Sequence, residues 1–208
     1  MKFTFTEPYF WHFFQGDFIG GLKQEFFGSY EAPPYTVLNT YEVNGKKFEE
    51  RKYEGNRKWV STKKVHKISE ERQNDMFMSL FNYITGKNET GAKIPMTVPV
   101  SMLNKPIDEE TKEMEMSFYL DAKQQDNPPK PNNPALYITN RPELTVYTRT
   151  VGGFMNETKW RKEMEELDEL IKAKGLKIDE SHYYTNGYDA PFKLWNRRNE
   201  VWRVKLNE

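Results

Sequence analysis

The 208-residue chain carries the same order of predicted elements twice, and this repeat limits the folds open to it. Two segments begin the repeat, FEERKYEGNRKWVSTKKV at 48–65 and LYITNRPELTVYTRTV at 136–151. Each starts extended, reaches an arginine (Arg51 or Arg141), turns, and continues with β-branched and aromatic residues at alternate positions. Such alternation is typical of half-buried strands, so each segment predicts two strands.

A helix follows in each half, over 70–85 in the first and 157–174 in the second. Both have residues typical of helix caps, because Ser and Asn accept hydrogen bonds from the first turn and Gly ends a helix readily. The caps are Ser69 and Gly86 for the first helix, and Asn156 and Gly175 for the second. Apolar residues recur every three or four positions in both, which predicts one buried stripe on each helix.

Two more extended segments follow each helix. They are 94–102 and 113–121 in the first half, and 182–192 and 199–206 in the second. Each half therefore reads ββαββ, and the fold class is α+β. Two four-stranded antiparallel sheets can protect their edges by closing edge to edge, with the helices packed outside.

The proline-rich segment DNPPKPNNP at 126–134 joins the two halves. It is too short to separate independent domains, so we expect one pseudo-symmetric domain over 33–208, with halves at about 33–125 and 135–208. An N-terminal arm, 1–32, precedes it. Because this arm is rich in aromatic residues, it suits either a membrane surface or packing on the domain, and we favour an arm docked on the domain.

The segment KIPMTVPVSM at 93–102 looks like a buried strand, yet Pro95 and Pro99 interrupt it. Proline has no backbone N–H to donate to a sheet, so the predicted strand is bent or lies at an edge. We expect Met96 and Met102, which stand beside these prolines, to pack in the core.

The composition excludes several classes of protein. Lysine plus arginine and aspartate plus glutamate both number 31, and such a neutral chain is a poor partner for nucleic acid. No cysteine is present, which excludes disulfides and thiol catalysis and fits a cytoplasmic location. No segment approaches the roughly 20 apolar residues of a membrane-spanning helix. The two Asn-Glu-Thr sequons, at Asn88 and Asn156, are interpreted as chance.

No catalytic or metal site is predicted. The three histidines, His12, His66 and His182, are far apart and form no metal-ligand spacing. The sequence also has no nucleophile elbow, phosphate loop or dinucleotide fingerprint. We therefore expect a protein that is not an enzyme.

The first predicted helix has apolar residues on more than one side. Met78 falls away from the main stripe, next to Phe81 and Asn74 in helical angle. A second apolar face of this kind suits a flat hydrophobic ligand, and basic residues near its rim can pair with ligand carboxylates. The candidate rim residues are Lys93, Lys193, Arg197 and Arg198.

Four motifs in the right order resemble the SOUL haem-binding protein family: IPMTVPV at 94–100, YITGKNE at 83–89, DNPPKP at 126–131 and YYTNGYDAPFKLWNRRNEVW at 183–202. The resemblance covers residues 33–206. It implies two ββαββ units, related by a pseudo-two-fold, that form a distorted eight-stranded antiparallel β-barrel with two flanking helices. It also implies reversible binding of haem and other tetrapyrroles, as a carrier or buffer and without a catalytic reaction.

The resemblance further implies a binding site. The family's proposed tetrapyrrole surface matches four positions on the first helix and one basic position near the C-terminus. With Met78 from the helical pattern, the candidate cofactor-binding residues are Asn74, Phe77, Met78, Phe81, Asn82 and Lys193. Lys52 stands where some members have a histidine proposed as axial iron ligand, so we expect haem to be held by burial and charge.

An alternative function is a protein-interaction module. Some family members bind apoptotic regulators through a BH3-like helix, which corresponds here to WRKEMEELDELIKAKG at 160–175. Met164, Leu167 and Ile171 have suitable spacing, but Leu167 replaces the small residue expected before Asp168. Because any amphipathic helix has this spacing, we favour a core-facing helix in a monomeric protein.

Overall fold

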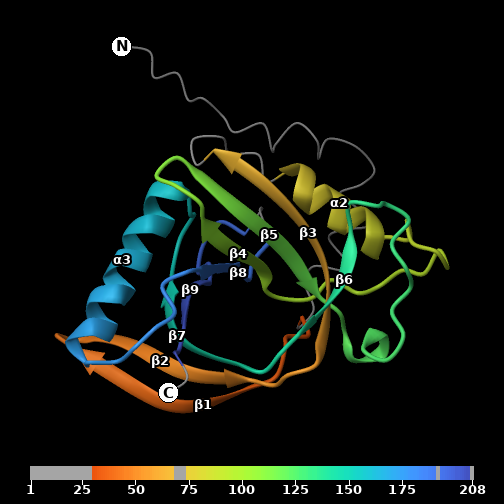
Figure 1. Ribbon diagram of the computed structural model, residues 1–208. Helices are drawn as coiled ribbons and strands as arrows, with labels where there is room; N and C mark the ends of the chain where they lie inside the picture. Colours follow the sequence, from red (N-terminus) through yellow and green to blue (C-terminus); the bar gives the residue numbers. More distant parts are fainter. Residues whose placement is uncertain (1–29, 68–73, 191–192, 207–208) are drawn as a thin grey trace.

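The computed structural model describes residues 30–67, 74–190 and 193–206 (Figure 1). These residues form one antiparallel sheet of nine strands and two α-helices. The strands are β1 Tyr35–Val43, β2 Lys46–Tyr53, β3 Arg57–Lys67, β4 Val100–Pro106, β5 Thr111–Tyr119, β6 Tyr137–Arg141, β7 Leu144–Val151, β8 Tyr183–Gly187 and β9 Asn199–Val204. The helices are α2 Asn74–Ile84 and α3 Glu157–Ala173, and a short 3-10 turn, η2, spans Ala122–Gln124. The predicted α+β class is confirmed.

The sheet is open, and the closed eight-stranded barrel is not formed by the described strands. Its strand order is β1-β2-β7-β9-β8-β4-β5-β3-β6. Closure of the eight strands β2 to β9 would require β2 to pair with β6. Instead β1 occupies that edge of β2, from the pair Tyr35 with Tyr53 to the pair Val43 with Lys46. The additional strand therefore takes the backbone groups that barrel closure needs.

Strand β1 is missing from the sequence prediction. A two-residue turn, Asn44–Gly45, connects it to β2, and both residues have positive φ, 51° and 76°. This geometry matches the right-handed twist of a hairpin, and Asn-Gly is the dipeptide that adopts it most readily. The Asn-Gly pair between two alternating segments was the signal that could have identified β1.

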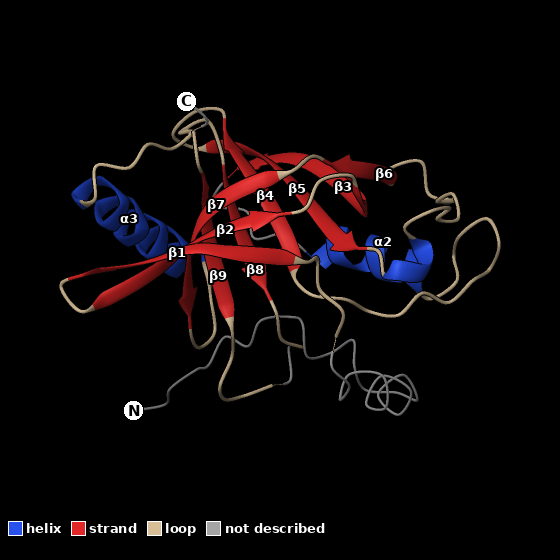
Figure 2. Cartoon of the chain, turned by 90° about the horizontal axis from the view of Figure 1, so that it is seen from below, coloured by secondary structure: helices blue, strands red, loops and turns tan. Residues whose placement is uncertain are grey.

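Both helices pack on the same face of the sheet. Helix α2 contacts β3 and β5, and α3 contacts β7 and β9. The central β4–β8 pair shows this. Met102 belongs to the core under α2 and lies opposite Thr185 on β8. Thr185 points to the same side of β8 as Tyr183, which packs against the core under α3, so both cores lie on one face. Figure 2 shows the helices at opposite ends of this outer face. The other, inner face carries Tyr184 and Trp202.

Helix α3 begins and ends as predicted. The side chain of Asn156 accepts a hydrogen bond from the backbone N–H of Lys159 at 2.9 Å. At the other end Gly175 has a φ of 67°, and the N–H groups of Gly175 and Leu176 return to Lys172 and Ile171. Capping at both ends explains why the sequence alone located this helix.

Helix α2 ends near the predicted position, before Gly86, which has a φ of 112°. The predicted cap Ser69 lies outside the described residues, as do residues 1–29 of the predicted arm. Of the residues that follow, Glu31 accepts hydrogen bonds from the backbone N–H groups of Val98 and Ala122, both at 2.9 Å. No helix in the described ranges is long and apolar enough to cross a membrane.

The predicted strand over 94–102 is too long. Residues 94–99 are irregular, and β4 begins only at Val100, directly after Pro99. The peptide bond between Val98 and Pro99 is cis. Proline cannot donate to a sheet, so regular pairing starts after it. Met102 lies in the core as expected, and Met96 packs against it from a partly exposed position.

Candidate functional site

Helix α2 places five of the predicted site residues on one side. Residues three or four positions apart lie on the same side of a helix. This spacing relates Asn74 to Phe77 and Met78, and relates those two to Phe81 and Asn82. The structure therefore brings the helical part of the candidate site together as one stripe. Below this stripe lies the core formed by α2, β3, β4 and β5.

The members of this stripe differ in their exposure. Phe77 and Met78 are partly buried, whereas Phe81 is only 5% exposed and belongs to the core. The rings of Phe77 and Phe81 stack with their centroids 5.9 Å apart, and Phe77 meets Phe118 edge to face at 5.3 Å. Phe77 and Met78 thus supply the accessible apolar surface, and Phe81 supports it from below. We call Phe77 and Met78, with Asn74 and Asn82 at its ends, the α2 face.

Lys193 is held within its own loop. Its ammonium forms an ion pair with Asp189, with 2.6 Å between nitrogen and oxygen, and about 40% of its side chain is exposed. Arg197 donates to the backbone oxygens of Ala190 and Lys193 and stacks over Phe154. Among the residues with described positions, no hydrogen bond or ion pair joins Lys193 to α2, so its place at the rim stays a prediction.

Lys93 is the candidate rim cation that the fold places near α2. The next residue, Ile94, donates its N–H to the carbonyl oxygen of Ile84 at the end of the helix, at 2.8 Å. Lys93 itself is exposed. The end of α2 therefore has a cation available to an acidic ligand.

The candidate axial position is remote from the α2 face. Lys52 lies on β2 and forms an ion pair with Glu143 at 2.9 Å. The ring of His182 accepts or donates a hydrogen bond with Ser181 and lies 3.4 Å from Asp179. In the part of the chain with described positions, no three His, Cys, Asp or Glu side chains gather to hold a metal ion.

The two sequon asparagines have structural roles. Asn88 is 3% exposed, and its amide nitrogen donates to the backbone oxygens of Tyr83 and Ala92. Asn156 caps α3. The side-chain amide of Asn88 is therefore buried, whereas Asn156 caps its helix from an exposed position.

Helix α3 presents its apolar stripe to the sheet. Met164, Leu167 and Ile171 are 4%, 0% and 2% exposed. Asp168 accepts two hydrogen bonds from the guanidinium of Arg203, at 2.6 and 2.5 Å. A partner could reach the BH3-like stripe only if α3 left the sheet, so the core-facing interpretation describes this helix.

The inner face holds a charged cluster that the sequence analysis missed. The carboxylate of Glu200 is fully buried and accepts hydrogen bonds from Arg51, Arg198, Tyr188 and Trp202 at 3.0 Å or less. Burial alone would raise the pKa of Glu200, but the two guanidinium groups and the tyrosine hold that pKa below its usual value. Arg51 and Glu200 lie 149 positions apart, so no local pattern connects them.

Apolar side chains that stay partly exposed side by side mark a candidate binding surface. Comparison with known proteins identifies the family of the chain. A family model described as "SOUL heme-binding protein" matches residues 30–204. The chain therefore belongs to the SOUL haem-binding protein family, as the sequence motifs predicted.

Two relatives show the extent of the similarity. Heme-binding protein 2 of Homo sapiens is 38% identical over 165 residues, which cover 77% of this chain and 79% of the human protein. Heme-binding protein 1 of Bos taurus is 31% identical over 192 residues, which cover 91% of this chain and 100% of the bovine protein. An uncharacterized conserved protein from Listeria innocua has a similar fold, with a TM-score of 0.50 at 9% identity, over 91% of this chain and 98% of that one.

Proposed function

We propose that this protein binds haem or a related tetrapyrrole reversibly on the α2 face, as a carrier or buffer and without catalysing a reaction. The observation that carries the proposal is the exposure of Phe77 and Met78 on top of an intact core, in a chain of the SOUL family. Large apolar side chains left partly in water at one place are typical of binding surfaces. A cytoplasmic, monomeric protein stays our prediction.

The residues present fit a tetrapyrrole held by contact and charge. Phe77 can stack on the flat macrocycle, and the flexible thioether of Met78 can follow its edge. Asn74 and Asn82 offer amide groups at the two ends, while Phe81 keeps Phe77 in place. Bound haem would present a flat apolar ring and two propionates, which are suitable partners for Lys93 and Lys193.

Titration with haemin and with metal-free protoporphyrin tests this function. We expect a shift of the Soret band and quenching of tryptophan fluorescence at micromolar ligand. Because no axial ligand is expected, the two compounds should bind within about threefold of each other. Absence of both signals would overturn the proposal.

Matched variants locate the site. Phe77→Ala and Met78→Ala should each weaken haemin binding by about tenfold, since each removes contact area worth about 1–2 kcal/mol. Leu38→Ala is the control, because Leu38 is an accessible apolar residue, 45% exposed, that lies on β1 and not on α2. Equal affinity in all three variants would place the ligand elsewhere.

We also propose that the two ββαββ units arose by duplication. The strand order supports this. Strands β2, β3, β4 and β5 of the first unit correspond to β6, β7, β8 and β9 of the second. When each strand is replaced by its counterpart, the order of the eight strands is the same sequence read from the opposite edge of the sheet. Only β1 stands outside the exchange. The two units are joined in the sheet by the central β4–β8 pair, so this proposal does not require either unit to fold alone.

A further inference from the structure

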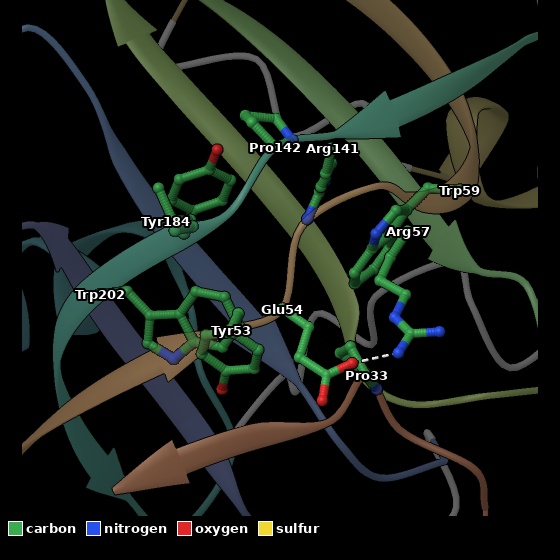
Figure 3. Close-up of a pocket in the computed structure, with 10 residues that line it drawn as sticks. Pro33, Tyr53, Glu54, Arg57, Trp59, Arg141, Pro142, Tyr184 and Trp202 are labelled. Atoms are coloured by element: carbon green, nitrogen blue, oxygen red, sulfur yellow. Dashed lines mark hydrogen bonds and ion pairs between the residues drawn. The ribbon is translucent and has the colours of Figure 1, made fainter. Parts of the chain in front are cut away.

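The inner face contains a small cavity that the α2 face does not share. Its volume is about 60 Å³, and its walls are mainly apolar, with four aromatic side chains among them (Figure 3). The residues that matter here are Tyr53, Trp59, Tyr184 and Trp202, with the cations Arg57 and Arg141. Cavities that hold a drug-sized ligand measure about 300–1,000 Å³, so this one suits a small polar group better than a macrocycle.

Arg141 reaches into this cavity between two rings. Its guanidinium lies 3.9 Å from the ring centre of Trp59 and 5.5 Å from that of Tyr184. Nη1 donates to the hydroxyl of Ser101 at 3.1 Å. Nη2 is buried and has no hydrogen-bond partner among the described residues. Burial lowers the pKa of this guanidinium, but an arginine stays charged in proteins.

The other arginines on the inner face have carboxylate partners. Arg51 pairs with Glu49 and Glu200, and Arg198 pairs with Glu200. Arg57 pairs with Glu54 at the cavity (Figure 3). Arg141 forms no ion pair within 4.0 Å with any carboxylate in the described ranges. Glu115 attracts it over a longer distance, and the carboxylate of Glu115 accepts a hydrogen bond from Tyr137.

A buried cation without a counter-ion destabilises a fold unless something compensates for its lost hydration. Contact with two aromatic faces compensates in part. It does not satisfy Nη2, which needs an acceptor. The cavity beside it is large enough for a few water molecules or one carboxylate group.

We propose that this cavity is a second binding site, which takes the carboxylate of a small monocarboxylic acid with a flat or short apolar body. The two carboxylate oxygens accept from Arg141, and the apolar body lies against Tyr53 and Leu144, which are neighbours on β2 and β7 in the wall of the cavity. Glu54 and Pro142 are exposed at that mouth, and the charge of Glu54 is neutralised by Arg57. The site is independent of the α2 face, since the sheet separates them.

Benzoate is a suitable probe, with benzamide as the neutral compound of the same shape. We expect saturable benzoate-dependent shifts of the Trp59 and Trp202 indole N–H signals in the NMR spectrum of the full chain. Benzamide should bind at least tenfold more weakly. Equal shifts with both compounds, or no saturation with benzoate, would overturn the proposal.

Arg141→Gln should weaken benzoate binding at least tenfold. Arg141→Lys keeps the positive charge and should retain part of the benzoate affinity. The control is Lys58→Gln, which removes a cation that donates to the backbone oxygen of Asp126 and does not line the cavity, so its effect should stay under threefold. Unchanged benzoate binding in Arg141→Gln would contradict the assignment.

Two further readouts separate this site from a structural role and from tetrapyrrole binding. If Arg141 serves a ligand, Arg141→Met should unfold at the same urea concentration as the wild type or a higher one, because an apolar side chain removes a buried charge. A large fall in that midpoint would make Arg141 structural.

Haemin affinity should be unchanged in Arg141→Gln, and benzoate affinity unchanged in Phe77→Ala. If Arg141→Gln does not fold, the unfolding temperature of the wild type is measured with benzoate and with benzamide. A rise with benzoate alone supports the site, and an equal rise or no rise with either compound contradicts it.

Discussion

The two helices cover equivalent ends of the same sheet, but different interactions hold them there. Helix α3 is fixed by ion pairs along its length, from Glu163 and Glu166 with Arg149 to Asp168 with Arg203. Helix α2 has one ion pair in the described residues, an exposed pair between Lys64 and Asp75. Partly buried apolar side chains border both cores, Trp160 on α3 and Phe77 and Met78 on α2, but those on α2 have fewer described ion pairs beside them.

The cores differ in composition as well. The core under α2 contains four buried methionines, Met76, Met102, Met114 and Met116, and that under α3 contains one, Met164. Methionine side chains adapt their shape at small cost. The core under α2 can therefore adjust its shape at a smaller cost than the core under α3.

Replacement of Phe81 should have the largest effect on stability. Phe81→Ala removes a ring that is 5% exposed and should lower the free energy of unfolding by about 3–5 kcal/mol, as expected for a buried Phe. Phe77→Ala on the same stripe should cost about 1 kcal/mol, because its ring is partly exposed. Urea denaturation measures both. If the two cost the same, the open surface of α2 extends to Phe81.

The next effect compares the helices directly. Leu167→Ala on α3 should cost about 2–5 kcal/mol, because Leu167 is fully buried, yet leave haemin affinity unchanged. Met78→Ala should cost less than about 1 kcal/mol and weaken haemin binding. Urea denaturation and haemin titration test the pair. Loss of haemin binding in folded Leu167→Ala would contradict the division of roles.

A smaller effect is expected at Asp168. Asp168→Asn keeps the shape but removes the charge that pairs with Arg203, and should cost about 1 kcal/mol, near the upper limit for partly exposed pairs. Glu169→Gln, at an exposed position next to it, is the control and should stay within about 0.5 kcal/mol. Equal values for both, by thermal unfolding, would show that the Arg203 pair does not stabilise α3.

The smallest effect is a pH dependence that is larger for α3 than for α2. A hydrogen bond from Lys46 lowers the pKa of Glu166; burial opposes this, and Arg149 lowers the pKa further. A carboxyl whose folded pKa is lowered stabilises the fold above its unfolded pKa of about 4.5, and this contribution is lost as the pH falls through the folded value. Hydrogen exchange should therefore show a falling opening free energy for α3 below about pH 4.5.

Glu166→Gln is the matched variant for this measurement. It should remove most of the acid-dependent change in α3 and leave α2 as it is in the wild type. An equal acid response of both helices in the wild type would mean that the pH dependence arises from the shared inner face, where Glu200 also has a lowered pKa.

The sequence by itself determined the elements whose signals are local. The caps Asn156 and Gly175 and a regular apolar stripe located α3, and alternating β-branched residues located β3 and β7. The family motifs, which are also contiguous, identified the family. These signals depend on residues within a few positions of one another, so they survive without knowledge of the fold.

Only the tertiary structure decided how these elements meet. Pairing of β1 with β2 left the sheet open, and the choice between exposure of Phe77 and burial of Phe81 depended on the neighbouring strands, since both share one side of α2. Arg51 and Arg141 looked alike in the repeat. The fold gave Arg51 a buried carboxylate 149 positions away and left Arg141 beside an aromatic cavity. Burial and charge pairing depend on residues distant in sequence, which only the packed sheet brings together.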